Sequence, residues 1–112
     1  MSAYEFDRAC ASGALDTAKK MLLENPEKIT AAVMDSGFKK ACREGNVEVA
    51  QWILSVKPER DTDILDRLTS LLDTRMEELT EEGIDSDYFV DDEEYQVIEM
   101  CIDFMSDKIK RK

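Results

Sequence analysis

Two stretches of this 112-residue sequence align with each other: residues 6–27, FDRACASGALDTAKKMLLENPE, and residues 38–59, FKKACREGNVEVAQWILSVKPE. The offset is 32 residues, and eight of the 22 aligned positions are identical. The identical pairs are Phe6/Phe38, Ala9/Ala41, Cys10/Cys42, Gly13/Gly45, Ala18/Ala50, Leu22/Leu54, Pro26/Pro58 and Glu27/Glu59. Since these positions are mostly apolar, small or turn-forming, we predict that the chain contains an internal structural repeat.

The spacing within each copy predicts a short helix, a tight turn and a second helix. Phe6, Ala9 and Cys10 follow one another at i, i+3 and i+4, which places them on one helical face. Gly13 and Gly45 stand where each first helix must end, and a left-handed residue at this position favours glycine. We therefore expect both glycines to have positive φ.

The second helix of each copy has its own start and stop signals. Asn46 is the expected N-cap of the second copy. Pro26 and Pro58 are expected to close the two units, because the residue before a proline resists the α conformation. Together these signals predict two helix–turn–helix units within residues 3–60.

The segments 9–18, ACASGALDTA, and 41–50, ACREGNVEVA, resemble the ankyrin repeat, and residues 45–58 are similar to the divergent ankyrin repeats of large DNA viruses of protists. The likeness covers residues 3–60. The family's Thr-Pro-Leu-His opening is replaced at 4–7 and 36–39, and its turn histidine by Ala14 and Asn46. Because that histidine ties neighbouring repeats by hydrogen bonds in the family, looser or differently angled stacking is expected here.

This resemblance implies a protein-binding module that contacts its partner through the connecting fingers and the short first helices. Residues 27–35 correspond to the finger, and Ser36 is expected to cap the helix that follows. The candidate partner-binding residues are Met34 and Asp35 on the finger, and Asp7, Arg8, Ala11, Lys39, Lys40 and Arg43 on the short helices.

After residue 60 the repeat gives way to two longer amphipathic helices. Asp61 or Thr62 is the expected cap of the first, and a break is predicted at 83–87. The apolar stripes are Ile64, Leu65, Leu68, Leu71, Leu72, Met76 and Leu79 on one helix, and Tyr95, Ile98, Cys101, Ile102, Met105 and Ile109 on the other. We read residues 61–112 as an acidic pair that caps the repeats, either a degenerate third repeat or an unrelated addition. The prediction is a single all-α domain over 1–112.

Charge divides the chain at the same place. Residues 1–60 hold nine acidic and nine basic side chains, whereas residues 61–112 hold seventeen acidic and six basic ones. Between 76 and 107 there are thirteen carboxylates and no Lys or Arg. This stretch either keeps the protein soluble or forms a surface for a basic partner. The candidate contacts are Asp85, Asp87, Tyr88, Phe89, Asp91, Asp92, Glu93 and Glu94, although both aromatics could instead pack on the last helix.

Several function classes find no support in the sequence. Histidine is absent, and Cys10, Cys42 and Cys101 are too far apart for a metal knuckle or a disulfide framework. An EF-hand loop starting at Asp85 would place Phe89, Val90 and Gln96 where ligands and glycine are required. The sequence contains no glycine-rich phosphate-binding loop and no apolar run long enough to span a membrane, and we expect no secretory signal. We expect no catalysis, cofactor, metal, membrane contact or direct nucleic-acid binding, and a cytoplasmic location (host cytoplasm for a viral protein).

Two functions remain as hypotheses. The first is a non-catalytic interaction module, an adaptor or inhibitor that binds another protein with a basic surface through the repeat fingers and the acidic C-terminal surface. The alternative is a nucleic-acid mimic that occupies the basic cleft of a nucleic-acid-binding protein. Mimicry predicts a steep loss of affinity with salt, whereas finger contacts predict a weaker dependence.

Overall fold

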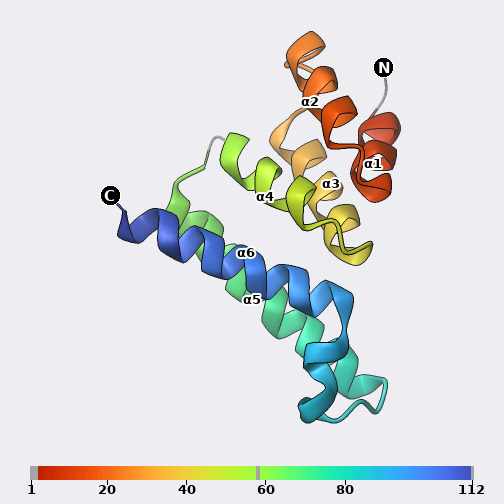
Figure 1. Cartoon of the computed structure of the whole chain (residues 1–112), viewed down its shortest axis with the longest axis vertical. Helices are drawn as coiled ribbons and strands as arrows, with labels where there is room; N and C mark the ends of the chain where they lie inside the picture. The colour runs from red at the N-terminus through yellow and green to blue at the C-terminus, as the bar shows by residue number, and fades with distance from the viewer. Residues whose placement is uncertain (1–2, 58, 112) are drawn as a thin grey trace. The chain divides into compact units, whose positions relative to one another are not determined.

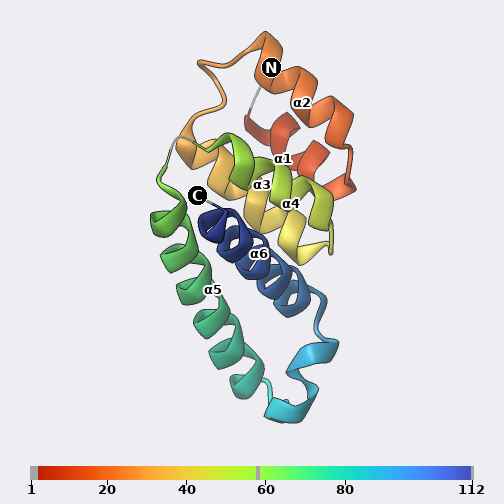
Figure 2. The same cartoon turned by 60° about the vertical axis from the view of Figure 1, so that its left-hand side comes forward.

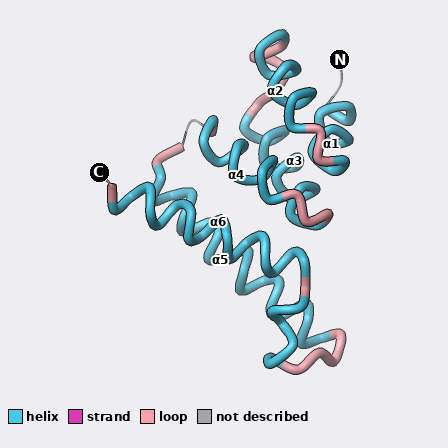
Figure 3. Tube along the Cα trace, in the orientation of Figure 1, coloured by secondary structure: helices cyan, strands magenta, loops and turns pink. Residues whose placement is uncertain are grey.

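The computed structural model describes residues 3–57 and 59–111, and this part of the chain contains helices and no strand (Figure 3). The all-α prediction is confirmed. The chain divides into two compact units, 1–58 and 59–112, close to the point where the charge changes. The helices are α1 (Ala3–Ser12), α2 (Leu15–Glu24), α3 (Ala31–Arg43), α4 (Val47–Val56), α5 (Asp61–Glu81), the 3-10 helix η1 (Ser86–Asp91) and α6 (Glu93–Lys110).

The first unit consists of two helix–turn–helix pairs, α1–α2 and α3–α4 (Figure 1). Helix α3 packs against both α1 and α4, and α2 packs against α1. The small and apolar residues that recur in the two copies form the core of this unit. They are Phe6, Phe38, Ala9, Ala41, Cys10, Cys42, Ala18 and Ala50, all of them buried.

Both repeat glycines adopt the left-handed conformation, with φ of 76° at Gly13 and at Gly45, as predicted. In each turn the amide after the glycine reaches back to the helix that has just ended. Ala14 N donates to Ala9 O at 2.9 Å, and Asn46 N donates to Ala41 O at 2.8 Å. These bonds are those of a Schellman motif, in which a residue without Cβ avoids the strain of positive φ.

We expect Gly45→Ala to lower the free energy of unfolding by about 1 kcal/mol, because alanine must take the same positive φ. Asparagine tolerates this conformation better, so Gly45→Asn should lose less. Chemical denaturation of the two variants and of the control Glu44→Ala, at the exposed neighbouring position, measures the difference. A Gly45→Ala midpoint equal to that of the control would contradict the strain argument.

Asn46 stands at the N-cap position of α4, but its side chain does not cap this helix. Its Nδ2 donates instead to the carbonyl oxygens of Cys10 at 2.9 Å and Ala11 at 2.8 Å. The last carbonyls of a helix have no partner inside the helix, which makes those of α1 ready acceptors. Looser or differently angled stacking was expected because the turn histidine is replaced; Asn46 nevertheless links the two helix pairs by hydrogen bonds. Asn46 occupies the predicted N-cap position, but the prediction that its side chain caps α4 is wrong.

The finger is shorter than predicted, because α3 already begins at Ala31. Thr30 is its N-cap, and the Thr30 hydroxyl accepts a hydrogen bond from Val33 N at 3.3 Å. The prediction that Ser36 caps the helix is therefore wrong. Ser36 lies inside α3, and its hydroxyl donates to Asp7 Oδ2 of α1 at 2.9 Å. Alanines 31 and 32 favour the helical state, which extends α3 through the segment predicted to be finger.

Both second helices end shortly before the prolines that were predicted to close the two units. Helix α2 ends at Glu24, two residues before Pro26. Helix α4 ends at Val56, and Pro58 lies outside the described residues.

The second unit is an antiparallel pair, α5 and α6, joined by η1 (Figures 1 and 2). Lys108 Nζ of α6 lies 3.7 Å from Asp61 Oδ1 at the first residue of α5. Helix α5 ends in a third left-handed glycine, Gly83, with φ of 85°, so the predicted break is confirmed. The buried residues are Ile64, Leu68 and Leu79 on α5, and Val97, Ile98, Cys101 and Met105 on α6.

The N-terminus of α5 differs from the prediction. Arg60 occupies the N-cap position and its side chain does not cap the helix, whereas Asp61 and Thr62 lie in the first turn. Asp61 still suits this place, because a carboxylate near a helix N-terminus interacts favourably with the helix dipole.

Candidate functional site

The most acidic part of the second unit is the connection between its helices together with the first two residues of α6, residues 83–94, which we call the acidic turn. Helix η1 forms its middle, with Tyr88 N donating to Asp85 O at 2.9 Å and Asp92 N donating to Phe89 O at 3.1 Å. Gln96 Nε2 of α6 donates to Val90 O. These bonds give the turn a defined backbone conformation, although the sequence predicted only a break here.

Arg75 of α5 forms ion pairs with two carboxylates at the C-terminal end of the acidic turn. Its Nε donates to Asp92 Oδ2 at 2.9 Å and its Nη2 donates to Asp92 Oδ1 at 2.8 Å. Glu94 Oε2 lies 3.2 Å from Arg75 Nε. Asp92 is also the N-cap of α6, because Oδ2 accepts from Tyr95 N at 2.9 Å. Asp92 and Glu94, which the sequence predicted as partner contacts, are thus engaged within the unit.

These contacts shift the ionisation of both partners. The hydrogen bond from Arg75 is the main cause that holds the pKa of Asp92 below its usual range, against the opposing effect of burial. The bond to Asp92 likewise raises the pKa of Arg75. Sequence reasoning missed Arg75, although one signal was present: it is the only cation between residues 68 and 107.

The two aromatic residues of the acidic turn have different environments. Phe89 is 8% exposed, and its ring lies 6.0 Å from that of Tyr95 at an angle of 55°. Phe89 is therefore buried against the last helix, which is the alternative to partner contact that the sequence left open for it. Tyr88 is 63% exposed and is available for a partner.

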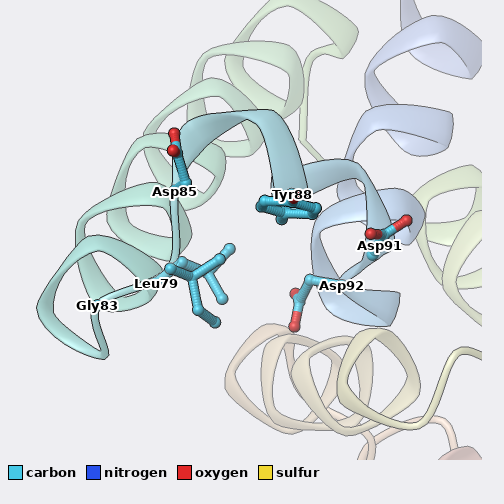
Figure 4. Close-up of a pocket in the computed structure, with 7 residues that line it drawn as sticks. Leu79, Gly83, Asp85, Tyr88, Asp91 and Asp92 are labelled. Carbon is cyan, nitrogen blue, oxygen red and sulfur yellow. The ribbon is translucent and has the colours of Figure 1, made fainter.

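Tyr88 borders a hollow that is open to solvent (Figure 4). Leu79, which is 1% exposed, comes from the end of α5, and Gly83 and Ile84 from the connection that follows it. The remaining lining residues are carboxylates of the acidic turn: Asp85, Asp91 and Asp92. The hollow therefore combines apolar surface with a negatively charged rim.

Four of the six predicted carboxylates are exposed: Asp85, Asp87, Asp91 and Glu93. None of them forms an ion pair with a cation in the part of the chain that the structure describes. Asp85 and Asp91 lie on the rim of the hollow, with Tyr88 between them in the view of Figure 4. No cation of the described residues therefore balances the negative charge of these four side chains.

Of the candidate partner-binding residues on α3, two are buried or paired within the unit and three are exposed. Met34 is 6% exposed and belongs to the core, and Asp35 pairs with Lys57, whose side chain is 4% exposed. Both lie on α3 and not on a finger, so their prediction as finger contacts is wrong. Lys39, Lys40 and Arg43 are exposed and lie within about one turn of each other near the end of α3.

The first unit's remaining candidates lie on α1. Asp7 is bonded to Ser36, and the guanidinium carbon of Arg8 lies 5.9 Å from the centre of the exposed Tyr4 ring. Ala11 is half-buried, and its carbonyl accepts from Asn46. Of these three, only Arg8 presents an exposed side chain.

Outside the acidic turn, few side chains in the described part of the chain could be reactive or bind a metal. Burial raises the pKa of the Cys10 and Cys101 thiols to about 12, with the charge of Asp7 adding to the effect at Cys10. Among the described residues no group of three or more Cys, Asp or Glu side chains is arranged to hold a metal ion. No helix in the described ranges is long and apolar enough to cross a membrane.

The chain matches no protein-family model, no curated protein and no solved structure. The features that remain to suggest a function are the exposed carboxylates of the acidic turn, the hollow beside Tyr88 and the basic end of α3.

Proposed function

We propose that this protein is a non-catalytic interaction module, an adaptor or inhibitor, that binds a partner protein with a basic surface through its acidic turn. The observation that carries the proposal is the set of exposed carboxylates at Asp85, Asp87, Asp91 and Glu93, which no cation balances among the described residues. Like charges gathered in this way oppose folding, and a basic surface would relieve their repulsion.

The same charges also favour fast association. A group of carboxylates creates a negative potential that extends about 10 Å at moderate salt and draws in a basic surface before contact. The single cation of this region, Arg75, pairs with Asp92 and Glu94 and so leaves the outer four carboxylates uncompensated. Electrostatic steering of this kind raises the association rate more than the final affinity.

In the proposal the first unit is an ankyrin-like repeat pair that supplies a second contact with the partner. Its support is the repeated helix–turn–helix pattern, with the same φ at Gly13 and Gly45, and the hydrogen bonds from Asn46 to the end of α1. The exposed end of α3 offers Lys39, Lys40 and Arg43 for this contact, which requires an acidic patch on the partner, separate from the basic surface that meets the acidic turn. Met34 and Asp35 are left out of it, because one is buried and the other is paired.

The test neutralises the four exposed carboxylates: Asp85→Asn, Asp87→Asn, Asp91→Asn and Glu93→Gln. Asp92 and Glu94 stay unchanged, because they hold Arg75 and the start of α6. A partner is isolated from the native host with immobilised wild-type protein, and its association rate is measured with purified components. We expect the variant to associate about tenfold more slowly and with a flatter dependence on salt.

The matched control changes the net charge equally at exposed positions of the first unit: Glu24→Gln, Glu27→Gln, Glu44→Gln and Glu48→Gln. Its association rate should stay close to that of the wild type. If the acidic-turn variant associates at the wild-type rate, the carboxylates only solubilise the protein and the end of α3 becomes the better candidate. A steep loss of affinity with salt, together with competition by nucleic acid, would favour the mimic instead.

A further inference from the structure

The acidic turn also presents apolar side chains to solvent. Tyr88 and Val90 are 63% and 56% exposed, whereas Phe89 between them is buried. Only Tyr88 borders the hollow; Val90 does not line it. Half-buried Ile84 adds further apolar surface, whereas Leu79 lines the hollow with almost none of its own surface exposed. A large apolar side chain entering from outside would therefore contact mainly Tyr88 and Ile84.

The hollow is held in shape by its surroundings. Ile84 N donates to Leu79 O at 3.0 Å after the left-handed Gly83, which fixes the end of α5 beneath it. On the other side, Asp92 is anchored by Arg75 and by Tyr95 N. A site that exists before binding loses little conformational entropy when a ligand enters, which favours even a small contact.

The carboxylates around the hollow determine which kind of peptide segment can bind there. Asp85 and Asp91 contribute carboxylates to its rim, and Asp87 is exposed on the same short helix. An apolar residue in an acidic segment would be repelled, whereas one between Lys or Arg residues would bring complementary charge to both sides. Binding hot spots commonly combine an aromatic anchor with a surrounding polar ring that excludes water.

We infer that the hollow beside Tyr88 receives one large apolar side chain from a basic segment of a partner protein, with Lys or Arg residues on either side contacting Asp85 and Asp91. This inference rests on the proposed function and adds an apolar anchor to it. It predicts that partners are selected by an apolar residue within a basic stretch and not by positive charge alone.

The test uses two synthetic peptides, GKRLRKG and GKRSRKG, which have equal charge and differ only at the central residue. Each is titrated into the isotopically labelled full-length chain and followed by amide chemical shifts in NMR spectra. We expect the leucine peptide to bind about fivefold more tightly than the serine peptide and to shift the amides of residues 83–91 most. Tyr88→Ser should reduce the binding of the leucine peptide to that of the serine peptide.

Two matched variants separate the contributions. Val90→Ser removes an equally exposed apolar side chain outside the hollow and should leave the fivefold preference unchanged. The pair Asp85→Asn and Asp91→Asn should weaken both peptides by a similar factor and keep the preference. The preference measured on wild-type protein needs no variant, so it remains informative even if one fails to fold.

Three outcomes would overturn the inference in different ways. If both peptides bind equally and Tyr88→Ser has no effect, the anchor is absent while the charge-driven function stands. If Tyr88→Ser weakens both peptides equally, Tyr88 contacts the cations and not an apolar residue. If neither peptide binds at low salt, or if the carboxylate variants change nothing, the acidic surface itself has no affinity for a basic segment and the proposed function fails too.

Discussion

Asp92→Ala should lower the free energy of unfolding by about 2–3 kcal/mol, because one side chain performs two structural tasks. It caps α6 through Tyr95 N, and loss of such a cap costs about 1 kcal/mol. It also accepts two hydrogen bonds from Arg75, whose side chain is only 17% exposed. A lost hydrogen bond to a charged group typically costs about 1.5–3 kcal/mol. Arg75 keeps Glu94 at 3.2 Å and Glu78 at 4.0 Å, so the loss here should lie in the lower part of that range.

Denaturant unfolding followed by circular dichroism measures this loss. Asp91→Ala is the matched control, since it removes a neighbouring carboxylate that is exposed and should change stability by less than about 0.5 kcal/mol. Asp92→Asn keeps a good N-cap residue but loses the charge, so it should fall between the two. Equal stabilities for Asp92→Ala and Asp91→Ala would show that the Arg75 cluster contributes nothing.

The same cluster should make the second unit sensitive to acid. The pKa of Asp92 is lowered by folding, so the unfolded chain binds more protons than the folded one near the ordinary value of 3.8. Stability therefore rises with pH in this range: the contribution of Asp92 is complete above about pH 5 and is lost as the pH falls through its lowered pKa. In Asp92→Ala this part of the acid sensitivity should disappear, which a series of unfolding curves between neutral and acidic pH would reveal.

Gly37→Val should destabilise the first unit by about 3 kcal/mol, because α1 and α3 approach each other at this glycine. A Cβ atom at Gly37 would lie 2.7 Å from Phe6 Cε2 and 2.8 Å from Cys10 Sγ. Both neighbours are completely buried, so neither can swing out into solvent to make room without moving other core side chains. Even Gly37→Ala should cost about 1 kcal/mol net, since its gain in helix propensity is smaller than the strain of overpacking.

Ala32→Val is the control for this substitution. Ala32 lies on the same helix but is exposed, so valine there reveals the intrinsic cost of a β-branched residue, about 0.5 kcal/mol. Thermal unfolding of the two variants should show a clearly lower midpoint for Gly37→Val. If the two midpoints coincide, the close approach of α1 and α3 at Gly37 does not constrain the fold.

Much of the local structure could be predicted from the sequence alone, because its causes lie within a few neighbouring residues. The 32-residue repeat, with apolar residues at helical spacing, predicted the helices of the first unit, and the two repeat glycines predicted its left-handed turns. Gly83 marked the end of α5 for the same reason. A glycine after an apolar helical stripe determines a helix end without help from distant parts of the chain.

Tertiary structure decided which of the candidate side chains remain available to a partner. Asp92 and Arg75 are 17 residues apart in the sequence, and Asn46 finds its acceptors 35 and 36 residues earlier. Phe89 and Tyr88 are adjacent and chemically alike, yet only Phe89 meets the Tyr95 ring. The composition of the acidic turn was visible in the sequence, but whether each of its charges and rings is paired, buried or exposed depends on which helix packs beside it, because hydrogen bonds and ring contacts act only across a few ångströms.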